Sequence, residues 1–283
     1  MKYSPFGLRI HCWGGLGSQL FAANLAFDIQ AKFPRKNVTL ILHSGGVTER
    51  LPELPEIFPN FHYGVINDYA ERESTEVSPI SFSRSVRKLL FKAFTYFGLM
   101  ATLDDDDSLS SIKYWTIAVR GHYSYRVISN QFLEKFYENL VGQGLSFEVF
   151  DSGSISLHYR LGDLLSLEEK SPIDNQRIVQ VIRFIEDRIP DAHIYLHSDS
   201  PKEALLLLTK SNLDLEIFVR RQPPLQLILN CSNSEHFIGT SSKISFWIAL
   251  VRSEILNRDS YLPKEKIDEF KWLSRTDTSI NFY

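Results

Sequence analysis

Residues 8–42 decide the fold, and they read LRIHCWGGLGSQLFAANLAFDIQAKFPRKNVTLIL. We predict a strand over Leu8–Trp13, a glycine turn, and a helix with apolar residues at three-to-four spacing, followed by a second strand over Asn37–Leu42. The helical positions are Leu16, Leu20, Ala23, Phe27 and Ala31. A strand, glycine turn, helix and strand in this order form a βαβ unit, so we expect a parallel sheet.

The second half of the chain alternates more regularly between strands and helices. We predict strands at Ser154–Tyr159, His193–His197, Glu216–Val219 and His236–Gly239, and helices at Asn175–Arg188, Lys202–Lys210, Leu225–Asn230 and Lys243–Leu256. This alternation predicts a second doubly wound α/β domain. We place the boundary at Asp151-Ser152-Gly153, which gives an N-terminal domain of residues 1–150 and a C-terminal domain of residues 151–283. The tail after residue 260 is expected to pack back on the N-terminal domain.

Composition excludes several classes of protein. The chain has 283 residues and a formal net charge of −3, which is not the charge of a typical nucleic-acid binder. Its two cysteines, Cys12 and Cys231, are too few for a disulfide scaffold or an all-thiolate zinc site. We find neither the apolar region of a signal peptide near the N-terminus nor the roughly 18 consecutive apolar residues of a membrane span. We therefore expect a cytoplasmic protein.

The turn Gly14-Gly15-Leu16-Gly17-Ser18-Gln19 is the first candidate binding motif. Its glycines let a ligand approach the backbone, and the helix that follows presents free N–H groups to an anion. A dinucleotide fingerprint is excluded, because Leu20 stands at the third glycine position and the second strand ends without an acidic residue. A tight turn that binds nothing remains the alternative.

The central motif is Ile155-Ser-Leu-His-Tyr-Arg-Leu-Gly-Asp163. His158, Arg160 and Asp163 fall at the carboxyl end of the predicted strand, where α/β proteins bind ligands. Arg160 suits two phosphate oxygens, and its alternative is a salt bridge between the domains. Asp163 either holds the loop or accepts a proton, and the ring of His158 either lines a nucleotide or makes a hydrogen bond within the strand.

Two later turns offer further candidates. Asp199 either caps the helix that opens at Pro201 or accepts hydrogen bonds from a guanine edge. Thr240, Ser241 or Ser242 is a natural N-cap, and the same turn presents amides and hydroxyls to a phosphate. The next helix carries Phe246, Trp247 and Leu250, which we interpret as core residues because of their spacing.

Other features point less directly to a function. The acidic run Asp104–Asp107 is either a solvated loop or a metal-binding group, and we favour the loop. Between residues 84 and 94, Arg84, Arg87, Lys88 and Lys92 interleave with apolar residues; such a helix either lies on an anionic membrane or has a charged outer face. The chain has no G-x-S-x-G elbow, no P-loop and no C-x-x-C motif, so hydrolase and ordinary NTPase interpretations lack their key parts.

Taken together, three stretches resemble the alpha-1,2-fucosyltransferase family (glycosyltransferase family 11). The family motifs G-G-L-G-N-Q, H-x-R-R-G-D and S-x-F-S-W-W correspond here to residues 14–19, 158–163 and 242–247. The short motifs Gly121-His122-Tyr123 and Ser198-Asp199 also match family patterns. Ser18, Leu161 and Ser200 depart from the family residues, which leaves the donor sugar and the linkage open.

The resemblance implies a GT-B-like fold of two Rossmann-like domains that face a central cleft. It implies an inverting transfer of L-fucose from GDP-fucose to a galactoside-type glycan, with no obligatory metal and no cofactor. In the site that it implies, Arg160 binds the pyrophosphate, His158 lines the nucleotide and Asp199 binds guanine. Further donor contacts come from Gly15, Gly17, Gln19, Ser241 and Ser242. Asp163 and His122 are the candidate bases.

Three functions follow from these observations. The first is a cytoplasmic fucosyltransferase of surface-polysaccharide synthesis, working at the inner membrane face through peripheral contact. The second is a transferase with the same fold that uses another nucleotide sugar. The third is a non-catalytic relative that binds a nucleotide or a glycan.

Overall fold

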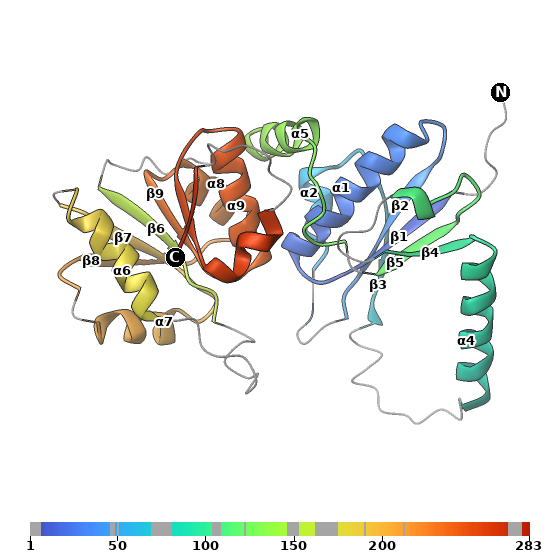
Figure 1. Cartoon of the computed structure of the whole chain (residues 1–283), viewed down its shortest axis with the longest axis horizontal. Helices are drawn as coiled ribbons and strands as arrows, with labels where there is room; N and C mark the ends of the chain where they lie inside the picture. Colours follow the sequence, from blue (N-terminus) through green and yellow to red (C-terminus); the bar gives the residue numbers. More distant parts are fainter. Residues whose placement is uncertain are drawn as a thin grey trace. The chain divides into compact units, whose positions relative to one another are not determined.

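Two parallel β-sheets organise the chain, one in each of two compact units, Met1–Phe132 (unit 1) and Leu133–Tyr283 (unit 2) (Figure 1). The computed structural model describes residues 7–45, 49, 51–68, 81–103, 109–121, 123–145, 153–161, 175–189, 191–211, 213–270 and 279–283, without the side chains of 81–88. Each unit is an α/β assembly around its own sheet, so the predicted fold class of two Rossmann-like domains is confirmed.

Unit 1 begins with the predicted βαβ unit. Strand β1 (Leu8–Trp13) leads into helix α1 (Leu16–Lys32) and then into β2 (Val38–His43), which pairs with β1 in parallel. The sheet order is β3-β2-β1-β5-β4, completed by β3 (His62–Ile66), β4 (Met100–Leu103) and β5 (Ala118–Gly121). The remaining elements are α2 (Leu54–Ile57), α4 (Ser81–Tyr96) and the short 3-10 helix η1 (Leu109–Ser111).

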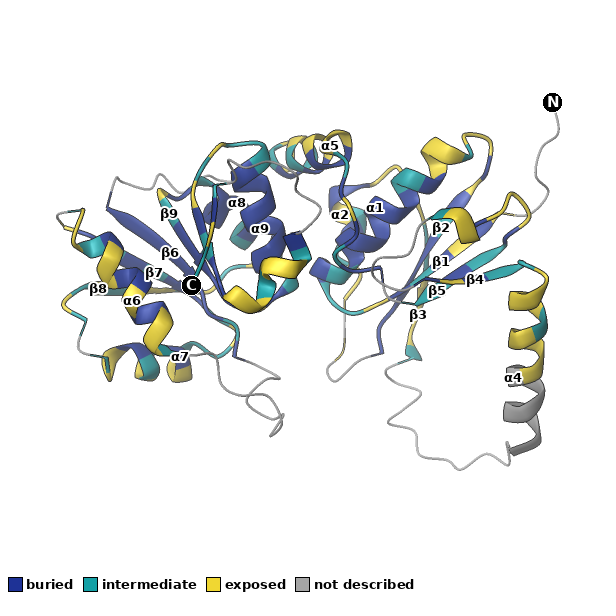
Figure 2. Ribbon diagram, in the orientation of Figure 1, coloured by how far each residue is buried: buried dark blue, intermediate teal, exposed yellow. Residues whose placement is uncertain are grey.

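The two faces of the unit 1 sheet differ in burial. Side chains alternate along β1, so Leu8, Ile10 and Cys12 are buried on the face that α1 covers. Their neighbours on the other face are more accessible: His11 is half-buried and Trp13 is exposed (Figure 2). This second face can therefore present polar side chains to a ligand.

Unit 2 carries a six-stranded parallel sheet in the order β11-β10-β9-β6-β7-β8. Its strands are β6 (Ser154–His158), β7 (His193–His197), β8 (Glu216–Arg220), β9 (His236–Gly239), β10 (Ser260–Leu262) and β11 (Ile280–Phe282). The helices are α6 (Asn175–Glu186), α7 (Pro201–Thr209), α8 (Pro224–Asn233) and α9 (Lys243–Glu254), and the 3-10 helix η3 spans Lys264–Phe270. The predicted alternation of strands and helices is confirmed.

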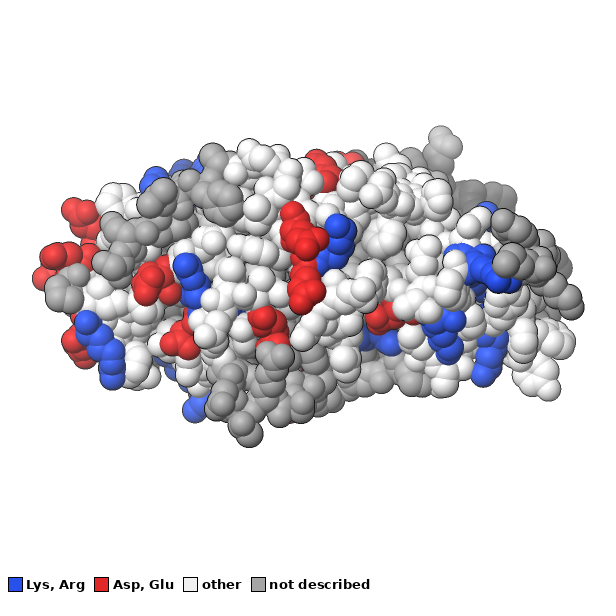
Figure 3. All heavy atoms as spheres, turned by 90° about the horizontal axis from the view of Figure 1, so that it is seen from above, with Lys and Arg blue, Asp and Glu red and all other residues white. Residues whose placement is uncertain are grey.

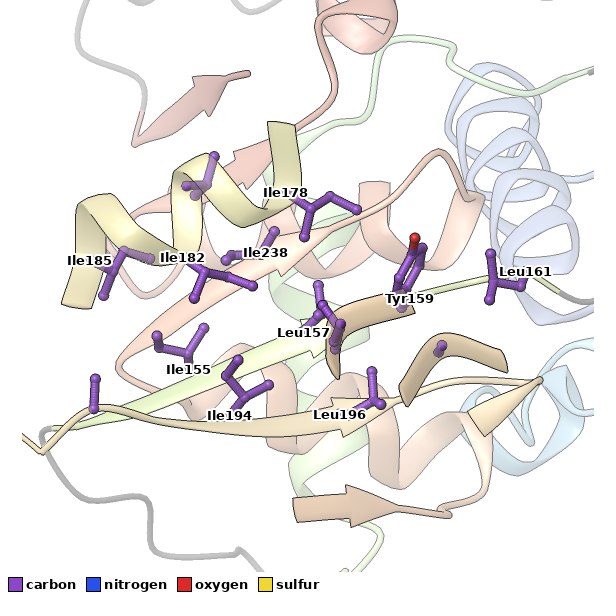
Figure 4. Close-up of a cluster of buried hydrophobic side chains, with 14 residues drawn as sticks. Ile155, Leu157, Tyr159, Leu161, Ile178, Ile182, Ile185, Ile194, Leu196 and Ile238 are labelled. Carbon is purple, nitrogen blue, oxygen red and sulfur yellow. The ribbon is translucent and has the colours of Figure 1, made fainter. Parts of the chain in front are cut away.

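Helices cover both faces of β6, whose five residues are all buried. On one face, Ile155 and Leu157 pack with Ile178 and Ile182 of α6 in a cluster of branched aliphatic side chains (Figure 4). On the other face, α8 and α9 pack together, with α8 against β6 and α9 against β9. Continuous burial is the mark of a central strand in a doubly wound sheet.

The described part of the tail belongs to the sheet of unit 2, where β10 pairs with β9 and β11 pairs with β10. The physical reason is that β9 would otherwise present unpaired backbone groups at an edge, and the extended segments 260–262 and 280–282 satisfy them. That the chain after residue 260 also packs on the N-terminal domain stays a prediction.

The division between the units falls within helix α5 (Asn130–Val141), upstream of the boundary that we placed at residue 151. In unit 1, Phe132 stacks on Phe58 with ring centroids 5.5 Å apart. In unit 2, Phe136 meets Trp247 of α9 at 5.7 Å. Phe136 precedes β6 in the sequence but already packs in unit 2. The start of strand β6 therefore does not mark the start of the unit.

The face shown in Figure 3 carries both signs of charge among uncharged side chains. Among the described helices, none combines the length and the apolar character needed to cross a bilayer.

Candidate functional site

The sequence motifs of unit 2 meet at one point of its sheet. Strands β6, β7 and β8 follow one another outward, and the chain then returns to place β9 on the other side of β6. The β6–β9 pair is therefore a topological switch point, where open α/β sheets bind ligands at the carboxyl ends of their strands. His158 and Gly239 are register partners at these ends, and His197 ends the adjacent β7.

Thr240 ties the ends of β6 and β9 together. Its hydroxyl donates to the carbonyl of His158 at 3.0 Å and accepts the N–H of Arg160, also at 3.0 Å. Thr240 is fully buried, so these bonds are shielded from water. The sequence had suggested Thr240 only as an alternative N-cap. Its position directly after β9 was the signal that could have identified this role.

Arg160 and Asp199 form one charged pair. The Nε of Arg160 lies 3.9 Å from one carboxylate oxygen of Asp199, and the other oxygen accepts the N–H of Leu161 at 2.9 Å. Both residues belong to unit 2, so this ion pair lies within one unit. The alternative in which Asp199 caps α7 is also wrong: Ser200 occupies the N-cap position and its side chain makes no capping bond.

The N-terminus of α9 is fixed by two serines. Ser242 is the N-cap, as predicted, and its hydroxyl accepts the N–H of Ser245 at 3.0 Å. The hydroxyl of Ser245 in turn lies 2.8 Å from Nδ1 of His158. Gly239 permits this approach, because a Cβ there would come within 2.7 Å of the Cβ of Ser245. Ser241 is exposed, whereas Ser242 is buried by its capping role.

The same helix confirms a core prediction. Phe246, Trp247 and Leu250 are essentially inaccessible to solvent. Burial of this face of α9 fixes the direction of its N-terminal amides toward the strand ends. The contribution of Ser245 had no separate signal in the sequence, since one serine among several in the turn is indistinguishable from the others.

Two neutral histidines lie at the carboxyl ends of β6 and β7. Burial, followed by the charge of Arg160, lowers the pKa of His158 to about 4. Burial, followed by His158 and Arg220, lowers the pKa of His197 to about 3. Within the described residues, neither ring nitrogen of His197 has a hydrogen-bond partner, although only 2% of the residue is exposed. Neutral rings can orient a ligand by hydrogen bonds, but they add no positive charge.

In unit 1 the glycine turn opens α1 as predicted, and its glutamine has a structural role. The amide oxygen of Gln19 accepts the N–H groups of Glu53 and Leu54 at 3.1 and 3.0 Å, and its nitrogen donates to the carbonyl of Leu51 at 2.8 Å. Gln19 therefore holds the segment before α2 against the turn. Gly15 is the N-cap residue and makes no side-chain capping bond to the first turn of α1.

Several predicted residues lie outside the described part of the chain. They are the candidate bases Asp163 and His122 and the acidic run Asp104–Asp107. Gly17 is described and is buried in the first turn of α1. Within the described ranges, no group of three or more His, Cys, Asp and Glu residues is placed to hold a metal ion.

A pocket that the sequence did not indicate lies in unit 2 beside α6. Its volume is about 380 Å³, which is the size of a small-molecule site. Its lining combines aromatic rings with basic and amide side chains, contributed by Phe184, Tyr261, Phe282, Tyr283, Arg177, Lys264 and Asn281. The hydroxyl of Tyr283 donates to the carbonyl of Gly239 at 3.1 Å, which connects the pocket wall to the switch point. None of the predicted site residues lines this pocket.

No family model matches the sequence, and no curated protein matches it. Among solved structures, POFUT1 in complex with GDP has 9% identity and a TM-score of 0.45, over 93% of this chain and 99% of that one. E. coli heptosyltransferase WaaC with ADP-2-deoxy-2-fluoro heptose has 12% identity and a TM-score of 0.45, over 90% and 88% of the two chains. A putative UDP-N-acetylglucosamine 2-epimerase from Listeria monocytogenes has 8% identity and a TM-score of 0.45, over 94% and 82%.

These similarities concern the arrangement of the chain and assign no chemistry to it. Membership of glycosyltransferase family 11 therefore stays a prediction.

Proposed function

We propose that this protein is a glycosyltransferase that moves a sugar from a nucleoside-diphosphate donor to a hydroxyl group of a glycan. The observation that carries the proposal is that Arg160, which follows β6, and the capped N-terminus of α9, which follows β9, both lie at the carboxyl ends of two paired strands. A guanidinium and the positive end of a helix dipole are both suited to a diphosphate.

In this proposal the chemistry depends on the leaving group. When the bond between the sugar and the β-phosphate breaks, negative charge develops on the departing diphosphate, and groups already in place can stabilise it. Arg160 supplies a fixed positive charge, and the first amides of α9 supply oriented dipoles. His158 and His197 stay neutral, so they add no positive charge at the strand ends. No metal ion is required in this scheme.

The finer part of the proposal names GDP-fucose as the donor, inversion at the anomeric carbon and a galactoside-type glycan as the acceptor. It rests on the resemblance of residues 14–19, 158–163 and 242–247 to the fucosyltransferase motifs. Asp199 needs a revised role here. Its carboxylate already contacts Leu161 and Arg160, so we now assign it to positioning Arg160 rather than to binding guanine.

The test is the variant Arg160→Ala, assayed with GDP-fucose and phenyl β-D-galactopyranoside. Loss of one group that stabilises the transition state lowers kcat/KM by about 100-fold or more. Arg183→Ala is the matched control, because Arg183 lies on α6 and donates to the carbonyl of Ser211. Near-normal turnover of Arg160→Ala would show that the reaction does not need Arg160, and it would contradict the proposed mechanism.

The choice of donor is tested by thermal unfolding with GDP, UDP, dTDP and ADP. A nucleotide that binds only the native state raises its stability by about 2.7 kcal/mol at a concentration of 100 Kd. We expect GDP to give the largest shift. A larger shift with UDP or dTDP would support the second function, a transferase with another donor.

One observation favours the third function, a non-catalytic relative. The Asp199 carboxylate that neighbours Arg160 must be shared with or displaced by a diphosphate, which weakens binding relative to an unpaired arginine. Stabilisation by GDP without any consumption of GDP-fucose, with or without an acceptor, would support this alternative.

We also propose cytoplasmic location with peripheral contact at the inner membrane face, through helix α4. Residues 81–96 contain four basic and no acidic side chains. Large apolar side chains of this helix and its end are exposed, among them Leu89, Leu90, Phe94 and Phe97. Flotation with vesicles of phosphatidylcholine, alone or mixed with phosphatidylglycerol, tests this: we expect binding only to the anionic vesicles and its loss in Leu90→Glu/Phe94→Glu.

A further inference from the structure

A chain of three hydrogen-bonding side chains lies in unit 1, at the carboxyl ends of β1 and β2. Nδ1 of His43 lies 3.0 Å from a carboxylate oxygen of Asp68, and Nε2 of His43 lies 3.0 Å from Nδ1 of His11. The three residues come from β1, β2 and the segment after β3, which are neighbours in the sheet. This arrangement links a carboxylate to two imidazoles in series.

Trp13 fixes this chain on one side. Its indole stacks on the ring of His43 with centroids 4.0 Å apart, and its N–H donates to Asp68 at 3.3 Å. The N–H of Gly45 donates to the second oxygen of Asp68 at 2.6 Å. Trp13 is 38% exposed, so part of its ring remains available to a ligand. An exposed indole beside polar groups is suited to the apolar face of a sugar ring.

The direction of the hydrogen bonds follows from the carboxylate. Ionised Asp68 only accepts, so the neutral His43 carries its proton on Nδ1 and accepts at Nε2. His11 must then donate from Nδ1, which leaves the lone pair on its Nε2. Within the described residues, no hydrogen bond reaches that nitrogen. The relay therefore ends in a proton acceptor on the half-exposed face of the sheet.

We propose that the Asp68–His43–His11 relay is the general base that activates the acceptor, a saccharide hydroxyl bound beside Trp13. This inference rests on the proposed glycosyl transfer. The hydroxyl proton passes to Nε2 of His11 while the oxygen forms its bond to the anomeric carbon. The bond between that carbon and the β-phosphate oxygen breaks, and the nucleoside diphosphate leaves with the electron pair. The proton afterwards returns to solvent, so atoms and charges balance.

The charges around the relay explain why three residues are needed. Burial, followed by Arg120, His43 and Arg9, lowers the pKa of His11 to about 4, which disfavours a positive charge on that ring. Burial pushes the pKa of Asp68 upward, but hydrogen bonds from Gly45, His43 and Trp13 outweigh it and hold the pKa below its usual value. Transfer of the Nδ1 proton from His11 to His43 places the positive charge beside this carboxylate.

A structural role for the same network makes different predictions. If the network only anchored the segment at Asp68 to the sheet, its variants would alter stability without altering how the rate depends on pH. A general base instead predicts a rate that falls on the acid side as the relay becomes protonated. Removing the carboxylate makes that protonation harder, so the acid limb moves to lower pH while the plateau rate falls.

The first test does not depend on turnover. Long-range 1H–15N spectra of the whole protein at neutral pH report which imidazole nitrogen carries the proton. We expect His11 to be protonated at Nδ1 and unprotonated at Nε2. Protonation at Nε2 of His11 would overturn the relay, whatever the donor of the enzyme.

The second test is kinetic and uses GDP-fucose with phenyl β-D-galactopyranoside between pH 3.5 and 9, a range chosen to include both the lowered pKa of His11, about 4, and the ordinary histidine pKa. We expect His11→Gln to lower kcat by about 100-fold or more, and Asp68→Asn by about tenfold or more with a shifted acid limb. The affinity for GDP should be unchanged in both variants. His62→Gln is the control, because His62 is exposed on β3 of the same sheet.

The outcomes separate the two proposals. A wild-type protein that binds none of GDP, UDP, dTDP and ADP and does not consume GDP-fucose contradicts the proposed function, while the tautomer of His11 still reports on the relay. An active wild type, with an unchanged pH profile in Asp68→Asn and normal kcat in His11→Gln, contradicts the relay alone. Equal loss in His62→Gln would also contradict it, because that residue lies outside the hydrogen-bonded chain.

Discussion

The carboxyl edges of the two sheets are built by different means. In unit 2, buried backbone and hydroxyl contacts through Thr240 and Ser245 bring the end of β6 against the turn before α9. In unit 1, side chains on a half-exposed sheet face form the Asp68–His43–His11 relay. A strand buried on both faces positions a ligand through rigid packing, whereas an open face leaves side chains able to exchange protons with a ligand.

The largest effect that we expect is on stability, when the buried cation of each unit is replaced. Arg252 is fully buried and donates to the carbonyls of Cys231, Ser232, Ser234, Glu235 and Asp259. Arg252→Met removes a buried donor from each of these carbonyls, although Ser234 keeps a bond from Arg258 and Cys231 keeps one from the Ser234 hydroxyl. We therefore expect a loss of about 3–5 kcal/mol in the free energy of unfolding, measured in urea.

The counterpart in unit 1 is Lys36, whose ammonium donates to the carbonyls of Tyr114 and Thr116. Burial lowers the pKa of Lys36 to about 8, so its charge is itself costly in the folded state. We therefore expect Lys36→Met to lower the free energy of unfolding by less than Arg252→Met does, in the same urea titration. An equal or larger cost would show that the two units depend on their buried cations to the same extent.

The next effect concerns the acid stability of unit 2. Since the pKa of His197 is about 3 in the folded state and 6.5 without burial, the unfolded chain takes up a proton first as the pH falls below 6.5. Stability that is complete above that pH is lost on acidification. Between pH 7.5 and pH 5, we expect the free energy of unfolding of His197→Leu to fall by about 2 kcal/mol less than that of the wild type.

The control for this measurement is His62→Leu in unit 1, since His62 is exposed. It should follow the wild-type dependence on pH in urea titrations. If His197→Leu also followed the wild type, burial of this imidazole would not be a source of acid sensitivity.

The smallest effect compares two strand glycines. A Cβ on Gly239 would meet Ser245 at 2.7 Å and Leu262 at 2.8 Å, whereas a Cβ on Gly64 would meet only the terminal methyl of Ile41 at 2.8 Å. A flexible methyl can move, but the packed N-terminus of α9 cannot do so without strain. We expect Gly239→Ala to cost about 1 kcal/mol more than Gly64→Ala in thermal unfolding, and equal costs would contradict the rigid packing of this edge.

The sequence predicted elements whose signals are local. The glycine turn before α1, the Ser242 cap and the buried face of α9 follow from short patterns, and all are present. Long-range partners had no such signal. Nothing near Gln19 in the sequence indicates that its amide holds residues 51–54. For Asp199 the sequence left a helix cap and a guanine contact open, and neither indicated its contact with Leu161.

The sequence by itself determined two alternating α/β halves and the strand-end placement of His158, Arg160 and Ser242, because hydrophobic periodicity and helix capping act over a few residues. Only the tertiary structure decided which side chains meet. His11, His43 and Asp68 are 32 and 25 positions apart and become neighbours because parallel pairing aligns β1, β2 and β3. Register between distant strands depends on packing of the whole sheet, which no local pattern encodes.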